Sequence, residues 1–364
     1  MANICNIPAI DEITAPWLTI QLRAAGFEGL TVKGFTRNPV GTGQGGHCYR
    51  LALDYENPKP DYPKTLIAKF PTSSELGRQA SVEQKIYLRE VQFFKQLAPR
   101  VSLTLPRLPR SYYAEINGHG PEFLLLLEDA APAAQGDQIK GCSTDLARLV
   151  VPGLVGLHAP SWHNSSIVDL DWLVDDQKVR NEWIMMIYRQ GLPHFIDRCG
   201  TALKQDELKL VERVAEATLF PSEAPAMAPH CLVHSDYRLD NMLIDDRTST
   251  PDVVIVDWQT MIVGNPMRDA SYFLGGCLTA EQRTPIEQDL VRDYHTTLVE
   301  AGVSGYTWQQ CWDDYRQSTF HGIMTAVVAM LYARQTERGD ALFRIMGQRH
   351  ALQALQLGAA EFIH

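Results

Sequence analysis

A short β-rich segment inside an otherwise helical C-terminal half constrains the fold more than any other part of the chain. It reads CLVHSDYRLDNMLIDDRTSTPDVVIVDWQ (231–259), and its apolar runs Met242–Ile244 and Val253–Val256 predict two brief strands around a polar turn. The residues on both sides predict helices, at 143–162, 176–217 and 281–364. The polar residues around this hairpin are therefore the first place to look for chemistry.

The spacing of polar residues in this segment is typical of phosphoryl-transfer catalytic loops. His234, Asp236 and Asn241 reproduce the pattern H-x-D-x-x-x-x-N, and Asp257 directly follows the second strand. Asp236 is predicted to act as the base that orients a hydroxyl and accepts its proton. Asn241 and Asp257 supply the oxygen ligands that Mg²⁺ prefers. Arg238 is predicted to neutralise charge on the phosphoryl group being transferred.

A rival interpretation makes the same segment a metal hydrolase site that uses His234 and Asp236. Such sites commonly need further histidine ligands, which the motif itself does not supply. In a phosphoryl-transfer loop the histidine braces the backbone, and this structural role is the one predicted for His234.

The N-terminal half is strand-rich. Residues 46–55 and 64–70 predict a hairpin across a proline-rich turn, and EFLLLLED (122–129) predicts a buried strand. Residues 74–97 predict one helix, with Val82, Ile86, Phe93, Phe94 and Leu97 on a common side. The small-residue stretch AAPAAQGDQIKG after the strand is the best candidate for a domain boundary, and the fold class is predicted to be α+β.

The stretch GTGQGG (41–46) has the spacing of two unrelated phosphate-binding loops. Its glycines, at positions 41, 43, 45 and 46, fit either a dinucleotide-binding turn that opens a helix or a kinase glycine loop that joins two strands. The residues after Gly46, HCYRLALDY, are strand-like, so the second is predicted. Glycines allow backbone N–H groups to approach ATP phosphates closely.

Composition limits the partners and the compartment. The formal net charge is −10, which disfavours nucleic acid as a partner. No apolar run is long enough for a membrane span, and the N-terminus shows no secretion signal. Seven cysteines are scattered without a C-x-x-C pair, which favours reduced thiols and a cytoplasmic protein.

The motif and its surroundings resemble a known enzyme superfamily. LVHSDYRLDNMLID, VVIVDWQTMIVGNPMRDASYFL, LLLLEDAAPAAQGDQIKG and LVGLHAPSW are similar to aminoglycoside phosphotransferases and choline kinases, and most to the ecdysteroid-kinase-like branch. The resemblance spans roughly 40–275. It implies a bilobal protein-kinase-like fold, with an N-lobe at 1–128, a hinge at 129–140 and a helical C-lobe at 141–364. It also implies phosphoryl transfer from ATP, or GTP, with Mg²⁺, to the hydroxyl of a small molecule.

The same resemblance assigns residues of the N-lobe. Lys69 in LIAKF takes the place of the lysine that holds the α- and β-phosphates of ATP. Its partner is expected to be Glu90, which shares a helix side with the apolar positions, and Glu83 remains the alternative. The backbone of residues 128–130 (Glu128, Asp129 and Ala130) is expected to face adenine, while the two acidic side chains either contribute or are simply solvated.

Two departures point away from protein kinases. Asp257 is followed by Trp258 and Gln259 without the usual glycine, and Asp269 comes only twelve positions after Asp257, which leaves little room for a regulatory segment. Asp269 is expected to cap a helix and brace the site. His158 is expected to be a hydrogen-bonded core residue.

Several alternatives stay open from sequence. The Trp and Tyr residues of 162–188 either pack in the core or line an acceptor pocket. The acceptor is a lipophilic alcohol, an antibiotic or a hydroxyacyl compound, and monomer or homodimer is undecided. Competing functions are a nucleotide-binding pseudokinase without turnover and a nicotinamide oxidoreductase, and the latter leaves the segment 231–259 without a role.

Overall fold

The computed structural model describes residues 7–41, 46–175, 177–216, 229–332 and 335–363. The chain divides into two compact units, and each is described by itself. Unit 1 comprises Met1–Val101, Arg107–Ala134 and Val254–Met261, and unit 2 comprises Ser102–Pro106, Gln135–Val253 and Ile262–His364.

Two segments join a unit other than the one that their neighbours in the sequence belong to. Val254–Met261, which carries Asp257, belongs to unit 1 although it lies far along the chain. The segment is held there because Ile255 N donates to Arg107 O at 2.9 Å. Ser102–Pro106 belongs instead to unit 2.

Unit 1 is built on a five-stranded antiparallel sheet with the order β1-β2-β3-β5-β4. The strands are β1 (Val32–Val40), β2 (Gly46–Tyr55), β3 (Thr65–Pro71), β4 (Ser111–Ile116) and β5 (Phe123–Glu128). The predicted hairpin and the predicted buried strand are therefore confirmed as β2, β3 and β5. Because Gly46 opens a strand, the helix that a dinucleotide-binding turn requires is absent at this position.

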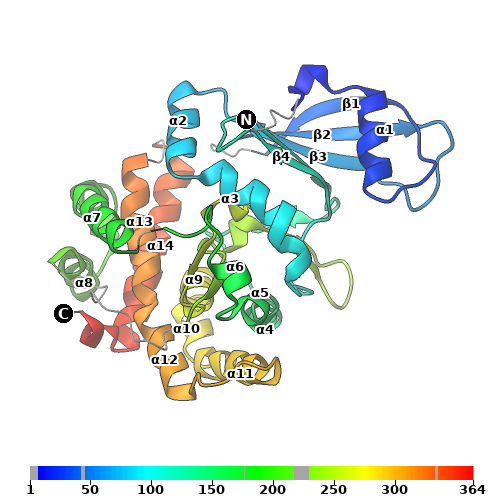
Figure 1. The fold of residues 1–364 in the computed structure, drawn as a ribbon. Helices are drawn as coiled ribbons and strands as arrows, with labels where there is room; N and C mark the ends of the chain where they lie inside the picture. The colour runs from blue at the N-terminus through cyan, green and yellow to red at the C-terminus, as the bar shows by residue number, and fades with distance from the viewer. Residues whose placement is uncertain (1–6, 42–45, 176, 217–228, 333–334, 364) are drawn as a thin grey trace. The chain divides into compact units, whose positions relative to one another are not determined.

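The period-two alternation of β3 separates a core face from a polar face of the sheet. Leu66, Ala68 and Phe70 are buried in the apolar core of unit 1, and α1 (Ala15–Ala24) packs on the same side, as Figure 1 shows. Lys69 points to the opposite face because it is out of phase with these residues.

The helix predicted over 74–97 is broken into three pieces. The structure has α2 (Glu75–Glu83), α3 (Ile86–Gln92) and a π-helical turn at Phe93–Leu97. Lys85 between the first two has φ 55°, a left-handed conformation that ends one helix and redirects the chain into the next. The spacing of apolar residues alone does not reveal such a break. The residues on each side of Lys85 still show helical spacing, and only the direction of the helix axis changes between them.

Unit 2 is mostly helical, which together with the sheet of unit 1 confirms the predicted α+β class. Its helices are α4 (Thr144–Gly153), α5 (Val155–Ser161), α6 (Ser165–Val168), α7 (Gln177–Cys199), α8 (Gln205–Glu216), α9 (Met267–Cys277), α10 (Ala280–Arg283), α11 (Glu287–Glu300), α12 (Trp308–Gln317), α13 (Thr319–Tyr332) and α14 (Glu337–Gln356). The side chain of Ser143 caps α4 as predicted, accepting from Leu146 N at 3.2 Å. No helix in the described ranges is both long and apolar enough to cross a membrane.

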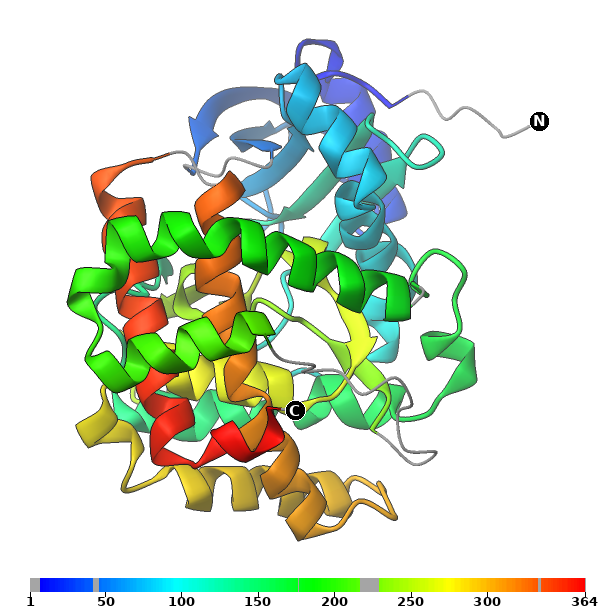
Figure 2. The same cartoon turned by 90° about the vertical axis from the view of Figure 1, so that its left-hand side faces the viewer.

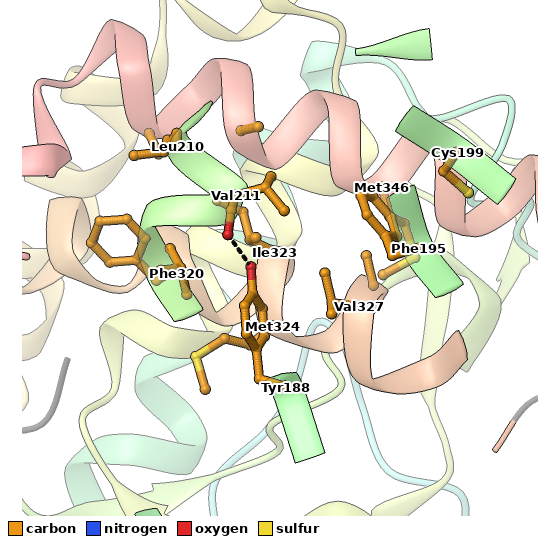
Figure 3. Close-up of a cluster of buried hydrophobic side chains, with 14 of the residues drawn as sticks. Tyr188, Phe195, Cys199, Leu210, Val211, Phe320, Ile323, Met324, Val327 and Met346 are labelled. Carbon is orange, nitrogen blue, oxygen red and sulfur yellow. Dashed lines mark hydrogen bonds between the residues drawn. The ribbon is translucent and has the colours of Figure 1, made fainter. Parts of the chain in front are cut away.

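The core of unit 2 lies where α7 and α8 pack across α13 and α14, as Figure 2 shows. Figure 3 shows the side chains that fill it, among them Phe195, Ile323 and Met346. Tyr188 is fully buried there, and its hydroxyl donates to Val211 O at 2.7 Å, which satisfies the one polar atom of its side chain. For Tyr188, the core alternative is therefore the correct one.

Short strands surround the motif segment. β7 (Cys231–Val233) pairs with β10 (Ile262–Gly264), and a second small sheet has the order β6-β8-β9. Its strands are β6 (Ala134–Gln135), β8 (Met242–Asp245) and β9 (Asp252–Ile255). The predicted pair of strands is confirmed as β8 and β9, and residues 234–241 form the loop that connects β7 to β8.

The close packing of α7 on α13 makes a testable prediction at Gly191. A Cβ atom built there would lie 2.6 Å from Val327 O, a backbone atom of α13. Gly191→Ala should therefore lower the free energy of unfolding by roughly 1–3 kcal/mol through overpacking, although alanine favours a helix. Urea unfolding followed by fluorescence measures this change. Gly34→Ala is the control, because nothing lies within 4 Å of its added Cβ atom, and equal stability of the two variants would contradict the predicted contact.

Candidate active site

Unit 1 brings together three of the predicted site residues. Lys69 on β3 lies 2.7 Å from the carboxylate of Glu90 on α3 and 3.4 Å from Asp257 Oδ1, which follows β9. The partner of Lys69 is thus Glu90 and not Glu83. The Glu90 side chain is only 2% exposed, whereas that of Asp257 is 29% exposed and remains accessible to a ligand.

The charge of Lys69 is maintained by these neighbours. Burial alone would lower the pKa of Lys69, but the carboxylates of Glu90 and Asp257 hold it above its usual value. The ammonium group is therefore a permanent cation in a protected position. Such a group can bind phosphate oxygens without a proton being lost.

An aromatic contact that the sequence analysis missed holds Asp257 beside α3. Trp258, noted from sequence only as a departure, is 1% exposed and stacks on Phe93, with ring centroids 3.8 Å apart. Asp257 itself has φ 69°, and Gln259 Nε2 donates to its Oδ2 at 3.2 Å. The buried tryptophan thus anchors the turn that presents the carboxylate. Only the three-dimensional structure reveals its partner, which lies far away in the sequence.

The predicted glycine loop is described only at its two ends. Gly41 has φ +78°, a conformation that glycine adopts readily, and Gly46 lies so close to Phe70 O that an added Cβ would come within 2.6 Å. Gly43 and Gly45 lie outside the described residues. Cys48 on β2 pairs with Lys69 across the strands, and burial raises the pKa of its thiol.

At the predicted hinge, both acidic side chains are engaged rather than solvated. Arg107 donates to the two carboxylate oxygens of Glu128 at 2.8 and 2.9 Å. Asp129 pairs with Arg50 at 2.5 Å, and its side chain is 3% exposed. The Ala130 carbonyl accepts from Ala133 N at 2.9 Å. These side-chain pairs shape the turn at the end of β5.

Unit 2 brings together the predicted base and its neighbours. Asp236 Oδ1 lies 2.9 Å from Arg238 Nε and accepts from the Tyr272 hydroxyl at 3.1 Å. Asn241 Nδ2 donates to Asp236 Oδ2 at 2.8 Å and to the Asp236 carbonyl at 2.9 Å. The carboxylate is therefore oriented from several sides. Tyr272 was not predicted, since it lies on α9, outside the motif.

The protonation state of Asp236 follows from these contacts. Burial alone would raise its pKa, but the Arg238 guanidinium, the nearby His234 and the hydrogen bonds from Asn241 and Tyr272 hold the pKa of this carboxyl below its usual value. Asp236 is thus ionised at neutral pH. A carboxylate of this kind orients a hydroxyl well and accepts its proton only late in a reaction.

Arg238 contacts two acidic side chains of its own loop, one on each side of it in the sequence. Besides its pair with Asp236, its Nη1 lies 3.4 Å from Asp240 Oδ2. Burial alone would lower the pKa of Arg238, but Asp236 and Asp240 oppose that shift and the guanidinium stays charged.

The loop backbone is braced by Asp269 from the first turn of α9. Its carboxylate is fully buried and accepts the backbone N–H groups of His234 and Ser235, each at 2.8 Å. His158, also fully buried, lies 3.5 Å from Asp269 Oδ2 and 2.8 Å from the Tyr294 hydroxyl. The expected bracing role of Asp269 and the expected core role of His158 match this geometry. The expected helix cap does not, because the Asp269 carboxylate binds the loop and not its own helix.

A second contact on the loop comes from α13 and was also missed. His321 Nε2 lies 2.8 Å from Ser235 O, so the ring donates to the carbonyl. Ser235 has φ 68°, an uncommon conformation for a residue other than glycine. Bonds to both its N–H and its carbonyl hold it in this conformation. No motif indicates this role, because His321 lies 86 positions away.

Each unit, taken by itself, holds an oxygen donor of the kind that Mg²⁺ prefers. Asn241 uses its amide nitrogen for Asp236, which leaves the amide oxygen available as a hard ligand. Asp257 offers an accessible carboxylate in unit 1. Among the described residues no group of three or more His, Cys, Asp or Glu could hold a metal by itself. Mg²⁺ is usually held by one or two carboxylates together with substrate phosphates and water, so the absence of a larger protein ligand group is compatible with it.

The aromatic residues of 162–188 are divided between roles. Trp162 packs beside a small core cluster with its ring 5.1 Å from that of Tyr306. Trp183 on α7 is 40% exposed. The alternative of an acceptor contact therefore stays open for Trp183.

A β-rich unit with a buried lysine–glutamate pair and a helical unit with a braced aspartate loop define the class of kinase-like small-molecule phosphotransferases. The sequence matches the ecdysteroid kinase-like family over residues 41–303, and the chain belongs to this family. No curated protein sequence matches it.

Solved structures share the fold at low sequence identity. A choline kinase from Cryptosporidium parvum Iowa II is 10% identical, with a TM-score of 0.53 and coverage of 89% of either chain. A GDP complex of an aminoglycoside 2'-phosphotransferase is 13% identical, with a TM-score of 0.53, and the match covers 93% of this chain and 98% of that chain. A gentamicin complex of APH(2'')-IIa is 14% identical, with a TM-score of 0.50 and coverage of 95% and 96%.

The brace at Asp269 makes a testable prediction about acid stability. Burial alone would raise the pKa of Asp269, but His158 and the backbone N–H of His234 hold it below its usual value. As pH falls below about 4, the unfolded chain takes up a proton that the folded carboxylate does not, so wild-type stability should fall.

In Asp269→Asn this contribution is absent. The variant should be less stable at neutral pH, and its free energy of unfolding should decline less steeply from about pH 4 downward. Urea unfolding at a series of pH values measures both slopes. The exposed Asp171→Asn serves as the control and should keep the wild-type slope. Equal slopes for wild type and Asp269→Asn would show that the carboxylate does not have this role.

Proposed function

We propose that this protein transfers the γ-phosphoryl group of ATP, or of GTP, to the hydroxyl of a small-molecule acceptor with the help of Mg²⁺. The observation that carries the proposal is the ionised Asp236, oriented by Asn241 and Tyr272 on a loop whose backbone is held by Asp269. Family membership supports the same class of reaction. The proposed acceptors are a lipophilic alcohol, an antibiotic or a hydroxyacyl compound.

The nucleotide residues are proposed in unit 1. The Lys69 ammonium, kept charged by Glu90, binds the α- and β-phosphate oxygens of the nucleotide. Backbone N–H groups around Gly41 and Gly46 cover the phosphates, and the backbone of 128–130 faces the base. Asp257 and Asn241 are the proposed ligands of Mg²⁺, which supplies positive charge to the phosphates when it is bound.

The transfer step is proposed at Asp236. Its carboxylate accepts a hydrogen bond from the acceptor hydroxyl and so points the oxygen at the γ-phosphorus. A bond forms between that oxygen and phosphorus, and the bond from phosphorus to the β,γ-bridging oxygen breaks, with its electron pair leaving on ADP. The hydroxyl proton passes to Asp236. Because the pKa of this carboxyl is low, its main contribution is orientation, as expected for a loose transition state.

Arg238 is proposed to serve both the base and the phosphoryl group. Its pairs with Asp236 and Asp240 hold the guanidinium close to the reacting oxygen. A cation there opposes the negative charge that develops on the phosphoryl oxygens.

Removal of the base tests the catalytic assignment. Asp236→Asn should lower kcat by roughly 10²–10⁴-fold, because the amide cannot accept the proton, while nucleotide binding is retained. A coupled assay of ADP release with a panel of hydroxylated compounds measures turnover. The control is Asp246→Asn, an exposed aspartate in the neighbouring β8–β9 turn. Undiminished turnover in Asp236→Asn would refute the assignment, and nucleotide binding by wild type without turnover on any acceptor would favour a pseudokinase.

Removal of the lysine tests the nucleotide assignment. Lys69→Met should weaken Mg-nucleotide binding by roughly 10–100-fold, the range expected for hydrogen bonds from a charged group. Isothermal titration calorimetry measures the dissociation constant, and circular dichroism checks that the variant is folded. Lys64→Met, exposed just before β3, should bind like wild type. A folded Lys69→Met protein with wild-type affinity would contradict the proposed phosphate contact.

A further inference from the structure

Arg268 is a charged residue of unit 2 that the proposed mechanism does not use. It is the second residue of α9 and is half-buried. Among the described residues, none forms an ion pair or a side-chain hydrogen bond with its guanidinium. By contrast, the buried Arg283 pairs with Glu287, and Arg238 pairs with two acids.

The position of Arg268 on α9 brings it close to Tyr272 and His321, two residues that contact the loop. It lies one helical turn before Tyr272 on the same face of α9, about 6 Å away by helical geometry. The Tyr272 hydroxyl donates to Asp236, and the Tyr272 ring lies 5.0 Å from the ring of His321. His321 in turn donates to Ser235 O. Arg268, Tyr272 and His321 therefore form one cluster, and Tyr272 links this cluster to Asp236, the residue that would receive the acceptor hydroxyl.

In this cluster, the positive charge of the Arg268 guanidinium is not paired with a carboxylate of any described residue. Burial lowers the pKa of Arg268, and the neighbouring Asp269 opposes that shift only in part, since its carboxylate is already bonded to His234 and Ser235. Burial and the charge of Arg268 lower the pKa of His321 to about 3, so this ring stays neutral. A partly buried cation without a partner has lost part of its hydration, and an anion bound beside it offsets that loss.

We propose that Arg268 is the anion-binding group of the acceptor site, and that the acceptor carries an oxyanion, such as a carboxylate, near the hydroxyl that is phosphorylated. This inference rests on the proposed function, because that function places the acceptor hydroxyl at Asp236. It selects among the proposed acceptors: a hydroxy acid or a hydroxyacyl compound with an anionic group satisfies the guanidinium. A polycationic antibiotic is repelled by it.

A binding experiment tests the cation without relying on turnover. Sulfate is the probe, and the thermal unfolding midpoint of the full-length protein is measured in sodium sulfate and in sodium chloride at equal ionic strength. Wild type should gain a saturable, sulfate-specific rise in Tm that Arg268→Met lacks. Without sulfate, Arg268→Met should unfold at the same temperature as wild type or higher, because an unpaired buried charge has been removed.

The exposed Arg344→Met on α14 is the matched control and should keep the sulfate response of wild type. The inference is overturned if Arg268→Met responds to sulfate as wild type does. It is also overturned if the variant loses stability without sulfate, since that result assigns Arg268 a structural role.

A substrate experiment tests the chemical class of the acceptor. Steroid, terpenoid and short-chain hydroxy acids are compared with their methyl esters in the ADP-release assay. Wild type should prefer the acids by roughly 10–100-fold in kcat/KM, the value of a charged hydrogen bond. Arg268→Met should lose this preference through a raised KM for the acid, Arg268→Lys should recover part of it, and the KM for ATP should not change.

The two proposals fail in different ways. If no compound supports ADP release, the proposed function is refuted, and the sulfate response still decides the role of Arg268. If wild type uses acids and esters equally well, the anionic acceptor is refuted while the kinase activity stands. A raised KM for ATP alone in Arg268→Met would assign the guanidinium to the nucleotide and overturn the inference.

Discussion

The buried carboxylate of Asp269 is the interaction on which the second unit's site depends. It accepts two consecutive backbone N–H groups of the loop, those of His234 and Ser235, and such charge-assisted bonds are stronger than neutral ones. They hold Ser235 in its left-handed conformation, and this conformation determines where the next side chain, Asp236, points. The hydrogen bonds from Asn241 and Tyr272 orient the Asp236 carboxylate, whose position depends on the loop backbone that Asp269 holds.

Two cations, Lys69 of unit 1 and Arg268 of unit 2, differ in how their charge is compensated. Lys69 has a carboxylate at 2.7 Å, so its charge is compensated within unit 1 and is available to phosphates as a fixed point of attraction. Arg268 lacks such a partner among the described residues, and the proposed partner is an anionic group of the acceptor. A compensated cation suits a ligand that already brings Mg²⁺. An uncompensated cation suits a ligand that brings its own negative charge.

The sequence predicted the elements whose evidence is local. The spacing from His234 to Asn241 placed Asp236 and Asn241 next to each other, and alternation predicted β2, β3 and β5 with Lys69 on one face. Prediction failed where long-range packing decides. The break at Lys85 changed the direction of the helix axis, and the stacking of Trp258 on Phe93 joined positions far apart in the chain. His321 and Arg268 carry no motif at all, since single residues on separate helices produce no periodic or spaced pattern.

By itself the sequence determined the class of chemistry, because a catalytic loop of eight residues carries its functional groups at fixed local distances. It also determined the α+β class, because strand and helix periodicities are properties of short segments. The tertiary structure alone decided which glutamate meets Lys69, what braces the loop, and that Arg268 has no partner in the described chain. Each of these depends on which side chains from distant segments occupy the same buried volume, and the energy of a buried charge is set by those neighbours rather than by its place in the sequence.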